Sequence, residues 1–425
     1  MLTTVALTFG GFLLLGVPIA AVLAGVTAVS LALHTSTPLL ILPQQLFNAL
    51  DNFVLLAIPF FILAGRIMTE GTMAQRLVEV MRALVGNKRG GLAVTAVLAC
   101  LFFAALSGSS PATLVAIGSI MIPALTRNGY PEDFSVGLIT SAGSLGIVIP
   151  PSIPMILYAL VMNVSVAELF MAGIGPGLLI GAVFVGYVLV RARKEDWRVE
   201  EGVSWAEALQ AVRRGIWALF LPVLVLGGIY TGVFTPTEAA AVSVVYALFV
   251  EAAIHRELSW GKLHRALVDS AVLSGSLLLI LACAMTFVWL LTSEGLPVRV
   301  ADWVVGRVDT AWAFLLLVNG LFLLLGSVMD DVSAMLILSP IFAETLRRLG
   351  IDPVHYGIVM VLVIEFGFLT PPFGLNLFVA MGLTQKPMGT VARATLPFLV
   401  LLLLTLLVVT YVPALSLWLP NLFYR

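Results

Sequence analysis

The sequence predicts an all-α polytopic membrane protein made of two inverted repeats, each with a re-entrant helical hairpin and a broken helix. Three observations predict this class: the composition, two apolar segments interrupted by polar residues, and a proline motif that occurs once in each half. Of the 425 residues, 60% are hydrophobic and 11% are charged. This charged share is about half that of an ordinary soluble protein, so the lipid bilayer is expected to be the main solvent.

The composition also excludes several classes of function. The 22 Lys and Arg residues nearly balance the 23 Asp and Glu residues, and no segment has the basic excess that binds nucleic acid. Cys100 and Cys283 both lie in apolar runs, so neither a disulfide framework nor a thiolate metal site is expected. The sequence has no P-loop and no His-Glu-x-x-His motif. We therefore do not expect an enzyme.

The elements can be assigned in chain order from the lengths of the apolar runs. The first run, Leu2 to Leu33, is too long for a signal peptide and precedes the first basic residue, Arg66. It is expected to be a first membrane helix, interrupted at Pro18. A spanning helix needs about 20 apolar residues. By this measure further spans are expected at 53–75, 135–158, 169–190, 215–231, 237–254, 267–292, 356–380 and 395–418.

Two other apolar stretches are interrupted in the middle. The stretch 92–125 contains Ser107-Gly108-Ser109-Ser110-Pro111, and the stretch 312–345 contains Gly326-Ser327-Val328-Met329-Asp330-Asp331. Each half has about 15 residues, which is too short to cross a bilayer. A pair of such segments indicates two re-entrant hairpins and a binding site near the membrane midplane.

The placement of basic residues supports this topology. We assign the segments 76–91, 127–133, 191–214, 255–266 and 384–394 to the cytoplasm, with 191–214 as a linker that carries an interfacial helix. All Lys and Arg residues then lie on that side except Arg299, Arg307, Arg347, Arg348 and Arg425. The positive-inside rule is satisfied only if each interrupted segment returns to the side from which it started. The first hairpin therefore opens toward the cytoplasm and the second toward the outside.

The two halves of the chain contain related sequences. Residues 146–157 align with residues 367–378 through a Pro-Pro pair in each. The pairs Pro150-Pro151 and Pro371-Pro372 follow Gly129 and Gly350 at the same spacing. With hairpins that open on opposite faces, the repeats have inverted topology. This is the architecture of alternating-access transporters, whose binding site lies at the interface between the repeats.

The proline pairs predict ion sites because they remove amide donors and so leave carbonyl groups free inside the membrane. A free carbonyl at that depth costs several kcal/mol unless a partner satisfies it, and a small hard cation is such a partner. A helix broken at the midplane also presents partial charges at its ends. One Na+ site is expected at Ser107, Gly108, Ser109 and Ser110 facing Gly146, Ile149 and Pro151, and a second at Gly326 and Asp330 facing Gly367, Thr370 and Pro371.

Carboxylates in apolar sequence are candidates for the same function. Asp330 is expected to neutralise a bound cation and Glu365 to bind a proton or a cation. The alternative for Asp331 and Glu365 is that they face water or cap a half-helix. The residues expected to bind the transported molecule are Ser110, Thr113, Pro150, Asp331, Glu365 and Asn376.

Several motifs resemble a known family across almost the whole chain. They are Phe12–Ala20, Ser107–Thr113, Gly118–Pro123, Gly146–Pro154, Phe234–Ala241 and Leu369–Phe378. Together they resemble the large, DctM-type membrane subunit of tripartite ATP-independent periplasmic (TRAP) transporters. Here Val332, Val363 and Asp331 depart from residues that are common in relatives.

The resemblance implies an elevator-type secondary transporter in the bacterial inner membrane. It implies coupling to a sodium gradient and import of a small organic acid, such as a C4-dicarboxylate, sialic acid or a sulfonate. It also implies two partners: a periplasmic substrate-binding protein (DctP-type) and a small four-helix membrane subunit (DctQ-type), expected here as a separate polypeptide. By motif position the family's sodium ligands transfer to Ser107, Ser109, Gly146, Ile149, Pro151, Asp330, Gly367 and Thr370.

The repeats and the resemblance together suggest a division into five segments. The transport domain is expected at 92–168 and 312–385, scaffold and arm helices at 1–91 and 169–311, and a C-terminal helix at 386–425. Two alternatives remain open for the function: a proton-coupled carboxylate transporter that works through Glu365, and a scaffold subunit that does not transport.

Overall fold

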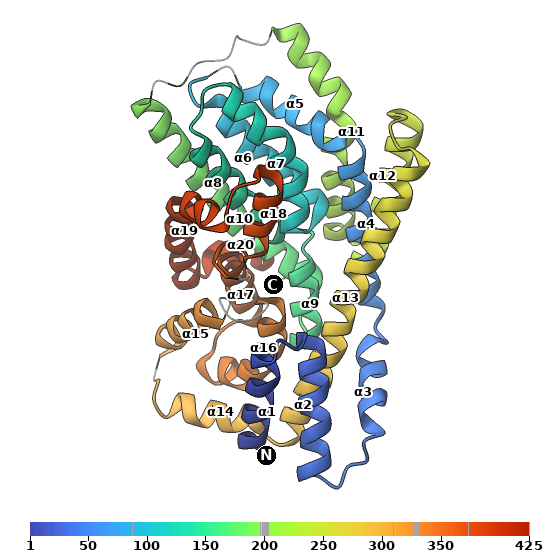
Figure 1. The fold of residues 1–425 in the computed structure, drawn as a ribbon, viewed down its shortest axis with the longest axis vertical. Coiled ribbons are helices and arrows are strands. Elements are labelled where there is room, and N and C mark those ends of the chain that lie inside the picture. The colour runs from blue at the N-terminus through green and yellow to red at the C-terminus, as the bar shows by residue number, and fades with distance from the viewer. Residues whose placement is uncertain are drawn as a thin grey trace.

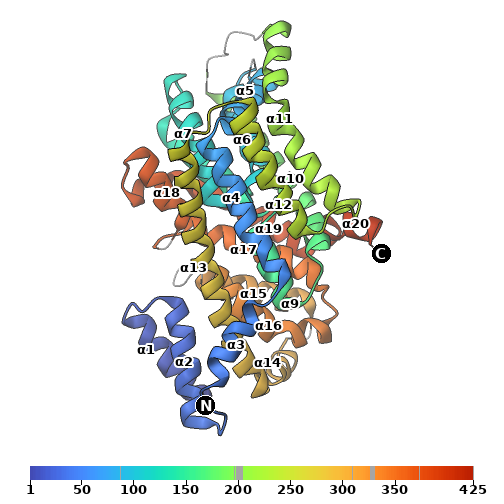
Figure 2. The ribbon, with the colours of Figure 1, turned by 90° about the vertical axis from the view of Figure 1, so that its right-hand side faces the viewer.

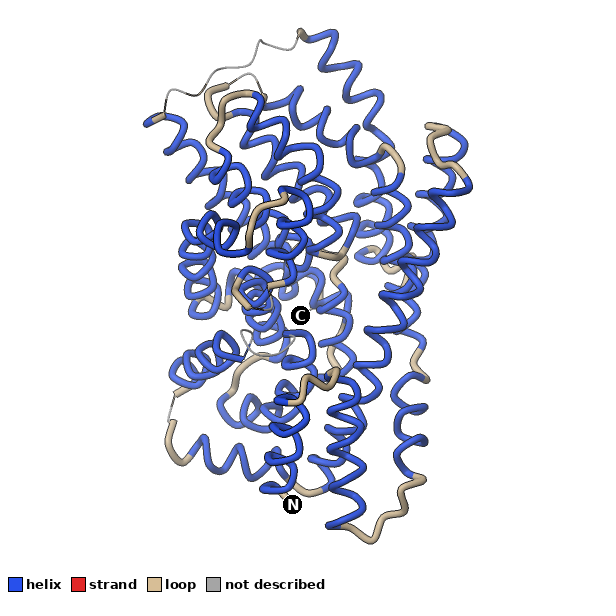
Figure 3. The backbone as a smooth tube through the Cα atoms, viewed as in Figure 1, coloured by secondary structure: helices blue, strands red, loops and turns tan. Residues whose placement is uncertain are grey.

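The computed structural model describes residues 1–86, 88–195, 197, 204–308, 310–325, 331–372 and 374–424, without the side chains of Leu2 and Asp331. Every regular element in these residues is a helix (Figure 3). Six helices are long and apolar enough to cross a membrane: 53–70, 166–194, 205–230, 236–254, 260–293 and 388–411. These six correspond to spans expected from the sequence.

The first apolar run forms two helices. They are α1 (Leu2–Leu14) and α2 (Ile19–His34), which lie side by side in Figures 1 and 2. The break follows from Gly16, whose φ is +71°, and from Pro18, whose ring cannot continue the preceding helix. Next come α3 (Ile41–Leu50), to which the sequence analysis assigned no element, the short η1 (Phe53–Leu56) and α4 (Ala57–Glu70).

The first predicted hairpin and the first broken helix are confirmed. After α5 (Met73–Val85), the helices α6 (Gly91–Ser107) and α7 (Ser110–Arg127) form the hairpin. The broken helix consists of α8 (Glu132–Gly143), η2 (Ser144–Ile147) and α9 (Ile153–Met162), and the Pro150-Pro151 bond between them is cis. The two halves of this element replace the single span expected at 135–158.

Long helices follow in the middle of the chain. They are α10 (Val166–Lys194), α11 (Trp205–Tyr230), α12 (Pro236–Phe249) with its π-helical end η3 (Val250–Ile254), and α13 (Trp260–Ser293). Capping boxes start α11 at Ser204 with Glu207 and α12 at Thr235 with Glu238. The basic segment before residue 215 is therefore the first part of α11 and not a separate interfacial helix.

The second repeat follows the same plan as the first. Its elements are α14 (Leu296–Val305), α15 (Ala311–Leu325), α16 (Asp331–Leu349), α17 (Pro353–Leu369), α18 (Leu375–Thr384), α19 (Met388–Tyr411) and α20 (Ala414–Phe423). Helices α15 and α16 form the second hairpin, and α17 and α18 form the second broken helix, with Pro371-Pro372 cis between them. In Figure 1 the hairpin α6–α7 and the hairpin α15–α16 occupy opposite halves of the molecule.

Ion pairs and aromatic contacts join the loops assigned to the cytoplasm. Lys386 Nζ lies 3.0 Å from Glu132 Oε2, and Arg265 Nη2 lies 3.2 Å from Glu70 Oε2. The ring of Trp197 lies 4.6 Å from that of Tyr130. The loops 127–133, 191–214 and 384–394 therefore lie close together, which is consistent with their assignment to one side of the membrane.

Helix α17 lies at the centre of the packing. Its residues from Val354 to Leu369 are all buried, and so are those of α8 from Phe134 to Gly143. A helix buried on all sides belongs to the core of a helical assembly. The two broken helices are therefore enclosed by the other helices, with their breaks in the interior.

Candidate transport site between the hairpin tip and the broken helix

The tip of the first hairpin is a tight turn between two helices. Helix α6 ends at Gly108, whose φ of +61° lies in the left-handed region that favours glycine. Ser109 is extended and lies at the N-cap position of α7 without a side-chain capping hydrogen bond, and Pro111 fixes the backbone in the first turn. Four polar or small residues, Ser107 to Ser110, are thereby held at the end of a helical pair.

This tip is in direct backbone contact with the first broken helix. The carbonyl of Gly108 accepts a hydrogen bond from the amide of Ile153 at 3.2 Å. A Cβ atom on Gly108 would lie 2.8 Å from the Pro151 carbonyl oxygen, and one on Gly146 would lie 2.5 Å from the Ser109 carbonyl oxygen. The structure thus brings together the residues expected to form the first ion site.

Side-chain hydroxyls already satisfy part of the free backbone at this contact. Thr113 donates a hydrogen bond to the Ser109 carbonyl at 3.0 Å, and its hydroxyl lies 2.8 Å from that of Ser107. The hydroxyl of Ser152 donates to the Ile147 carbonyl at 2.6 Å. The proline break therefore does not leave every carbonyl free. Ile149 directs its side chain toward Gly177 on α10 and offers only its backbone to the site.

The second predicted ion site is described on one side only. Thr370 caps the end of α17, donating its hydroxyl proton to the Phe366 carbonyl at 2.6 Å, and its amide donates to the Gly367 carbonyl at 3.3 Å. Pro371 follows at the break. The hairpin residues Gly326 and Asp330 and the side chain of Asp331 lie outside the described part of the chain.

The two repeats meet at a side-chain hydrogen bond. The amide nitrogen of Asn376, on α18, donates to the hydroxyl of Ser110, at the start of α7, at 2.6 Å. Both side chains are fully buried. The second broken helix is therefore fastened to the tip of the first hairpin.

A cavity of about 330 Å³ lies beside the tip. Its lining includes Ser107 to Ala112 from the hairpin, Arg66 from α4, Leu273 and Leu277 from α13, Val332 from α16, and Phe368, Leu375 and Val379 from the second broken helix. The cavity thus lies between the long helices α4 and α13 on one side and the hairpins and broken helices on the other. Its few polar groups are the serines and Arg66.

Arg66 was not among the site residues expected from the sequence, where its charge was interpreted only as a marker of the cytoplasmic side. The signal was present, since Arg66 falls inside the expected span 53–75, where a charged residue suggests function. Its Nη1 lies 4.0 Å from Asp269 Oδ2, and the two side chains are 32% and 51% exposed. An ion pair this long and this exposed contributes little free energy. The guanidinium therefore remains able to bind another anion.

Of the described residues that were expected to bind the transported molecule, one lines the cavity and the others do not. Ser110 lines the cavity. Thr113, Pro150, Asn376 and Glu365 are buried beside the breaks and are not among the lining residues.

Glu365 is an isolated carboxylate in the middle of α17. It is fully buried and lies beside Ser144, yet neither of its oxygens accepts a hydrogen bond from the residues that the structure describes. A buried carboxylate without a partner is costly when it is charged. It is therefore a group that a proton or a cation would stabilise.

A cavity at the interface of two inverted repeats, each with a helical hairpin and a broken helix, is typical of a membrane transport protein of the secondary type. The chain belongs to the family of the tripartite ATP-independent periplasmic transporter, DctM component, whose sequence model matches residues 6–415. It is thus a large permease subunit and not an enzyme, as the sequence predicts.

Individual relatives agree with this assignment. A C4-dicarboxylate TRAP transporter large permease protein DctM from Pseudomonas aeruginosa is 48% identical over 377 residues, covering 89% of this chain and 88% of the relative. The protein of the same name from Rhodobacter capsulatus is 43% identical and covers 96% of both chains. The YdaH transporter of Alcanivorax borkumensis has the same fold, with a TM-score of 0.65, 18% identity, and coverage of 97% of this chain and 98% of YdaH.

Proposed function

We propose that this chain is the sodium-coupled permease of a TRAP system that imports a small organic acid, with a dicarboxylate as the favoured substrate class. One observation carries the proposal: the serine-rich tip Ser107–Ser110 closes on the break at Gly146–Pro151 and shares a cavity with Arg66. The tip supplies oxygen atoms and Arg66 supplies a positive charge.

The substrate class follows from the cavity and from the relatives. A guanidinium forms paired hydrogen bonds with a carboxylate, and the serine hydroxyls beside it can donate further ones. The apolar remainder of the lining suits the short carbon chain of such an acid. Two relatives that cover most of the chain are named for C4-dicarboxylates, which supports the same class.

Sodium coupling is supported by the kind of oxygen atoms at the break. Backbone carbonyls of an unwound membrane helix, together with hydroxyls, are the ligands that transporters offer to Na+. Here the carbonyl of Ile149 and the hydroxyls of Ser107 and Ser109 lie at such a break. At the second break the carbonyls of Gly367 and Thr370 each accept one backbone hydrogen bond, and each keeps a second lone pair that an ion could use. Sodium bound there would hold the tip and the break together.

The arrangement of the cavity favours an elevator motion. One wall consists of α4 and α13, and the other consists of the hairpins and broken helices. Sliding the second wall along the first would carry a molecule bound at the tip to the other side of the bacterial inner membrane. We expect a periplasmic binding protein to deliver the substrate and a small four-helix subunit to complete the membrane part.

Uptake into proteoliposomes tests the proposal. The vesicles contain this chain and its small subunit, and the outer solution contains the binding protein with a labelled dicarboxylate. We expect an inward sodium gradient to drive uptake without ATP and in the presence of a protonophore. Uptake that requires no sodium gradient and collapses with the protonophore would refute sodium coupling.

Proton coupling through Glu365 is the second candidate, and the unpartnered buried carboxylate is the observation that favours it. Glu365→Gln keeps the size of the side chain and removes the titratable group. If uptake in this variant no longer responds to a proton gradient while the parent protein does, the carboxylate is the coupling group. A complete absence of gradient-driven uptake with every partner present would instead favour a scaffold subunit that does not transport.

A further inference from the structure

A second cavity, of about 360 Å³, lies at the end of the molecule that carries the basic loops. Three helices meet there: α5, the first part of α11, and the end of α12. Its polar lining consists of Arg76, Gln210, Arg213, Arg214, Trp217 and His255. It is separate from the transport cavity, and nothing in the transport mechanism uses it.

The charge of this cavity is unbalanced. Arg76 donates from Nε to the hydroxyl of Thr72 at 3.3 Å, which leaves the outer nitrogens of its guanidinium available. In the part of the chain that the structure describes, no carboxylate lies within ion-pair distance of Arg213 or Arg214. Three guanidinium groups around one hollow favour an anion with several oxygen atoms.

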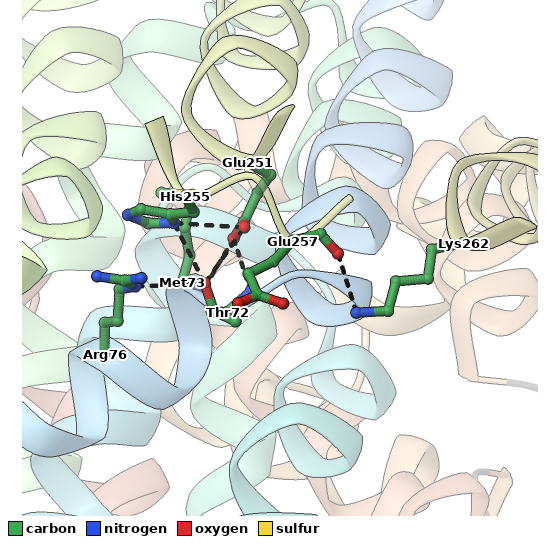
Figure 4. A network of polar contacts seen from close by, with 7 residues as sticks. All are labelled: Thr72, Met73, Arg76, Glu251, His255, Glu257 and Lys262. Carbon is green, nitrogen blue, oxygen red and sulfur yellow. Dashed lines mark hydrogen bonds and ion pairs between the residues drawn. The ribbon is translucent and has the colours of Figure 1, made fainter. Parts of the chain in front are cut away.

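A buried histidine on the cavity wall points to a ligand independently of the arginines. The side chain of His255 is 2% exposed, and no residue that the structure describes forms a hydrogen bond with its Nε2. Its Nδ1 lies 3.3 Å from Glu251 Oε2 and 3.2 Å from the hydroxyl of Thr72. Figure 4 shows this network, with Arg76 beside the ring. Because Nδ1 faces the Glu251 carboxylate, Nδ1 carries the proton of the neutral ring. A second proton would bind to Nε2, which could then donate a hydrogen bond to an anion.

The network that holds His255 is itself fixed. Glu251 is fully buried and accepts hydrogen bonds from the backbone amides of Thr72 at 2.9 Å and Met73 at 2.7 Å. A Cβ atom on Gly71 would collide with the Glu251 carboxylate, so the helices approach closely here. The unpartnered nitrogen is therefore held at the cavity wall and cannot turn away to find a partner elsewhere.

The depth of the cavity matches the headgroup region of a bilayer. The polar segment 205–214 of α11 passes into its apolar segment at about residue 215, next to the lining residues Arg213, Arg214 and Trp217. A tryptophan beside arginines is typical of the boundary between lipid and water. Basic pockets between membrane helices on the cytoplasmic side are suited to anionic lipid headgroups.

We propose that this cavity binds the phosphate group of an anionic phospholipid, with Arg76, Arg213, Arg214 and His255 as its ligands. Free phosphate presents the same chemistry, and an acidic segment of a partner protein would be a competing occupant. The lipid is favoured by the depth of the pocket, because acyl chains can follow the apolar surface of α11 below it. A bound headgroup would tie α5, α11 and α12 together at this end.

Native mass spectrometry of the intact chain released from detergent tests the proposal, with phosphatidylglycerol and phosphatidylcholine as the probes. The test variant is R213Q/R214Q, and the control is R193Q/K194Q, which removes the same charge from an exposed pair at the same end, at the last turn of α10. We expect phosphatidylglycerol to bind the parent and the control about equally. The test variant should bind it about 30-fold more weakly, the loss expected for two basic contacts.

Each other outcome of this experiment overturns the proposal. Equal binding of phosphatidylglycerol to both double variants would place the lipid elsewhere. Displacement of the lipid by millimolar inorganic phosphate would identify a site for free phosphate. Loss of the lipid when the small subunit is added, with the subunit cross-linking to a cysteine placed at Gln210, would identify a protein interface. Because a misfolded variant would also lose lipid, the melting temperature of each variant is measured in parallel.

Discussion

The side-chain amide of Asn376 donates a hydrogen bond to the hydroxyl of Ser110 over a distance of 2.6 Å, across 266 positions of sequence. This contact joins the second broken helix to the tip of the first hairpin. Both groups are fully buried, so neither can exchange its partner for water. The two repeats are therefore coupled at the site itself.

Removing this hydrogen bond should weaken both the fold and transport. We expect Asn376→Ala to lower the free energy of unfolding by about 1–3 kcal/mol, because the Ser110 hydroxyl loses its buried partner. A double-mutant cycle with Ser110→Ala, read by thermal unfolding, measures the coupling between the two side chains. Additive effects of the two substitutions would show that the contact contributes no stability.

The close approach at Gly108 predicts a loss of function from one added methyl group. Gly108→Ala places a Cβ atom 2.8 Å from the Pro151 carbonyl oxygen, in a backbone conformation that alanine rarely adopts. We expect uptake to be abolished. Gly129→Ala is the matched control, since Gly129 also has a positive φ, of +82°, but no atom of the described residues lies within 4 Å of its Cβ position. If both variants transport equally well, contact between the tip and the break is not required.

Neutralising Arg66 should weaken substrate binding more than it slows transport at saturation. In Arg66→Gln the cavity loses its only cation among the lining residues described, and we expect the KM for a dicarboxylate to rise about tenfold or more. Arg265→Gln, which breaks an exposed pair with Glu70, is the control. Asp269→Asn releases Arg66 from its weak partner and should leave KM unchanged or lower it. An unchanged KM in Arg66→Gln would remove this residue from the site.

The acid sensitivity of the basic cavity follows from His255. Burial is the main cause that lowers the pKa of this ring, Arg76 lowers it further, and Glu251 and Glu257 oppose the shift. A histidine whose pKa is lowered by folding adds nothing to stability while the ring is neutral in both states, and it destabilises the folded state as the pH falls below about 6.5. A bound anion reverses the shift by stabilising the charged ring beside Arg213 and Arg214.

We therefore expect phosphatidylglycerol to bind more tightly at pH 6 than at pH 8. His255→Asn should remove this pH dependence while the arginines still hold the lipid. The measurement is the binding titration repeated across this pH range for the parent and the variant. A pH dependence that persists in His255→Asn would assign it to another group.

The buried Glu251 predicts a stability effect outside the transport site. The Glu251 carboxylate accepts hydrogen bonds from the backbone amides of Thr72 and Met73, and Glu251→Gln replaces it with a neutral amide oxygen. We expect the free energy of unfolding to fall by about 1–3 kcal/mol. Glu257→Gln changes an exposed carboxylate six residues later and serves as the control. Equal melting temperatures for the two variants would contradict the role assigned to Glu251.

Local features of the sequence predicted most of the architecture. The tract Ser107–Ser110 and the two Pro-Pro pairs each interrupt an apolar run. The length of each apolar half then shows whether it can cross the membrane or must form half of a hairpin. The capping box of Thr235 and Glu238, which marks the start of α12, is a local signal of the same kind. These signals are readable because each depends on residues that are neighbours in the chain.

The features that could not be predicted from the sequence depend mainly on contacts between residues that are far apart in the chain. Whether Arg66 faces the cytoplasm or a cavity depends on how α4 packs against a hairpin some forty residues away. The contact of Glu251 with Thr72 joins residues 179 positions apart. Helix α3 was not expected because its ten residues are too few to span, and none of them is buried. No periodic pattern reveals such pairings, since they are settled only by packing.

The close approaches at Gly108 and Gly146 have a mechanical consequence. Surfaces separated by a layer of side chains can slip past one another as rotamers change, but surfaces in backbone contact cannot. The tip Ser107–Ser110 and the first broken helix should therefore behave as one stiff part that moves without internal shear. Any rearrangement that exposes the cavity then has to occur at the apolar interface with α4 and α13, where leucine side chains from α13 line the cavity.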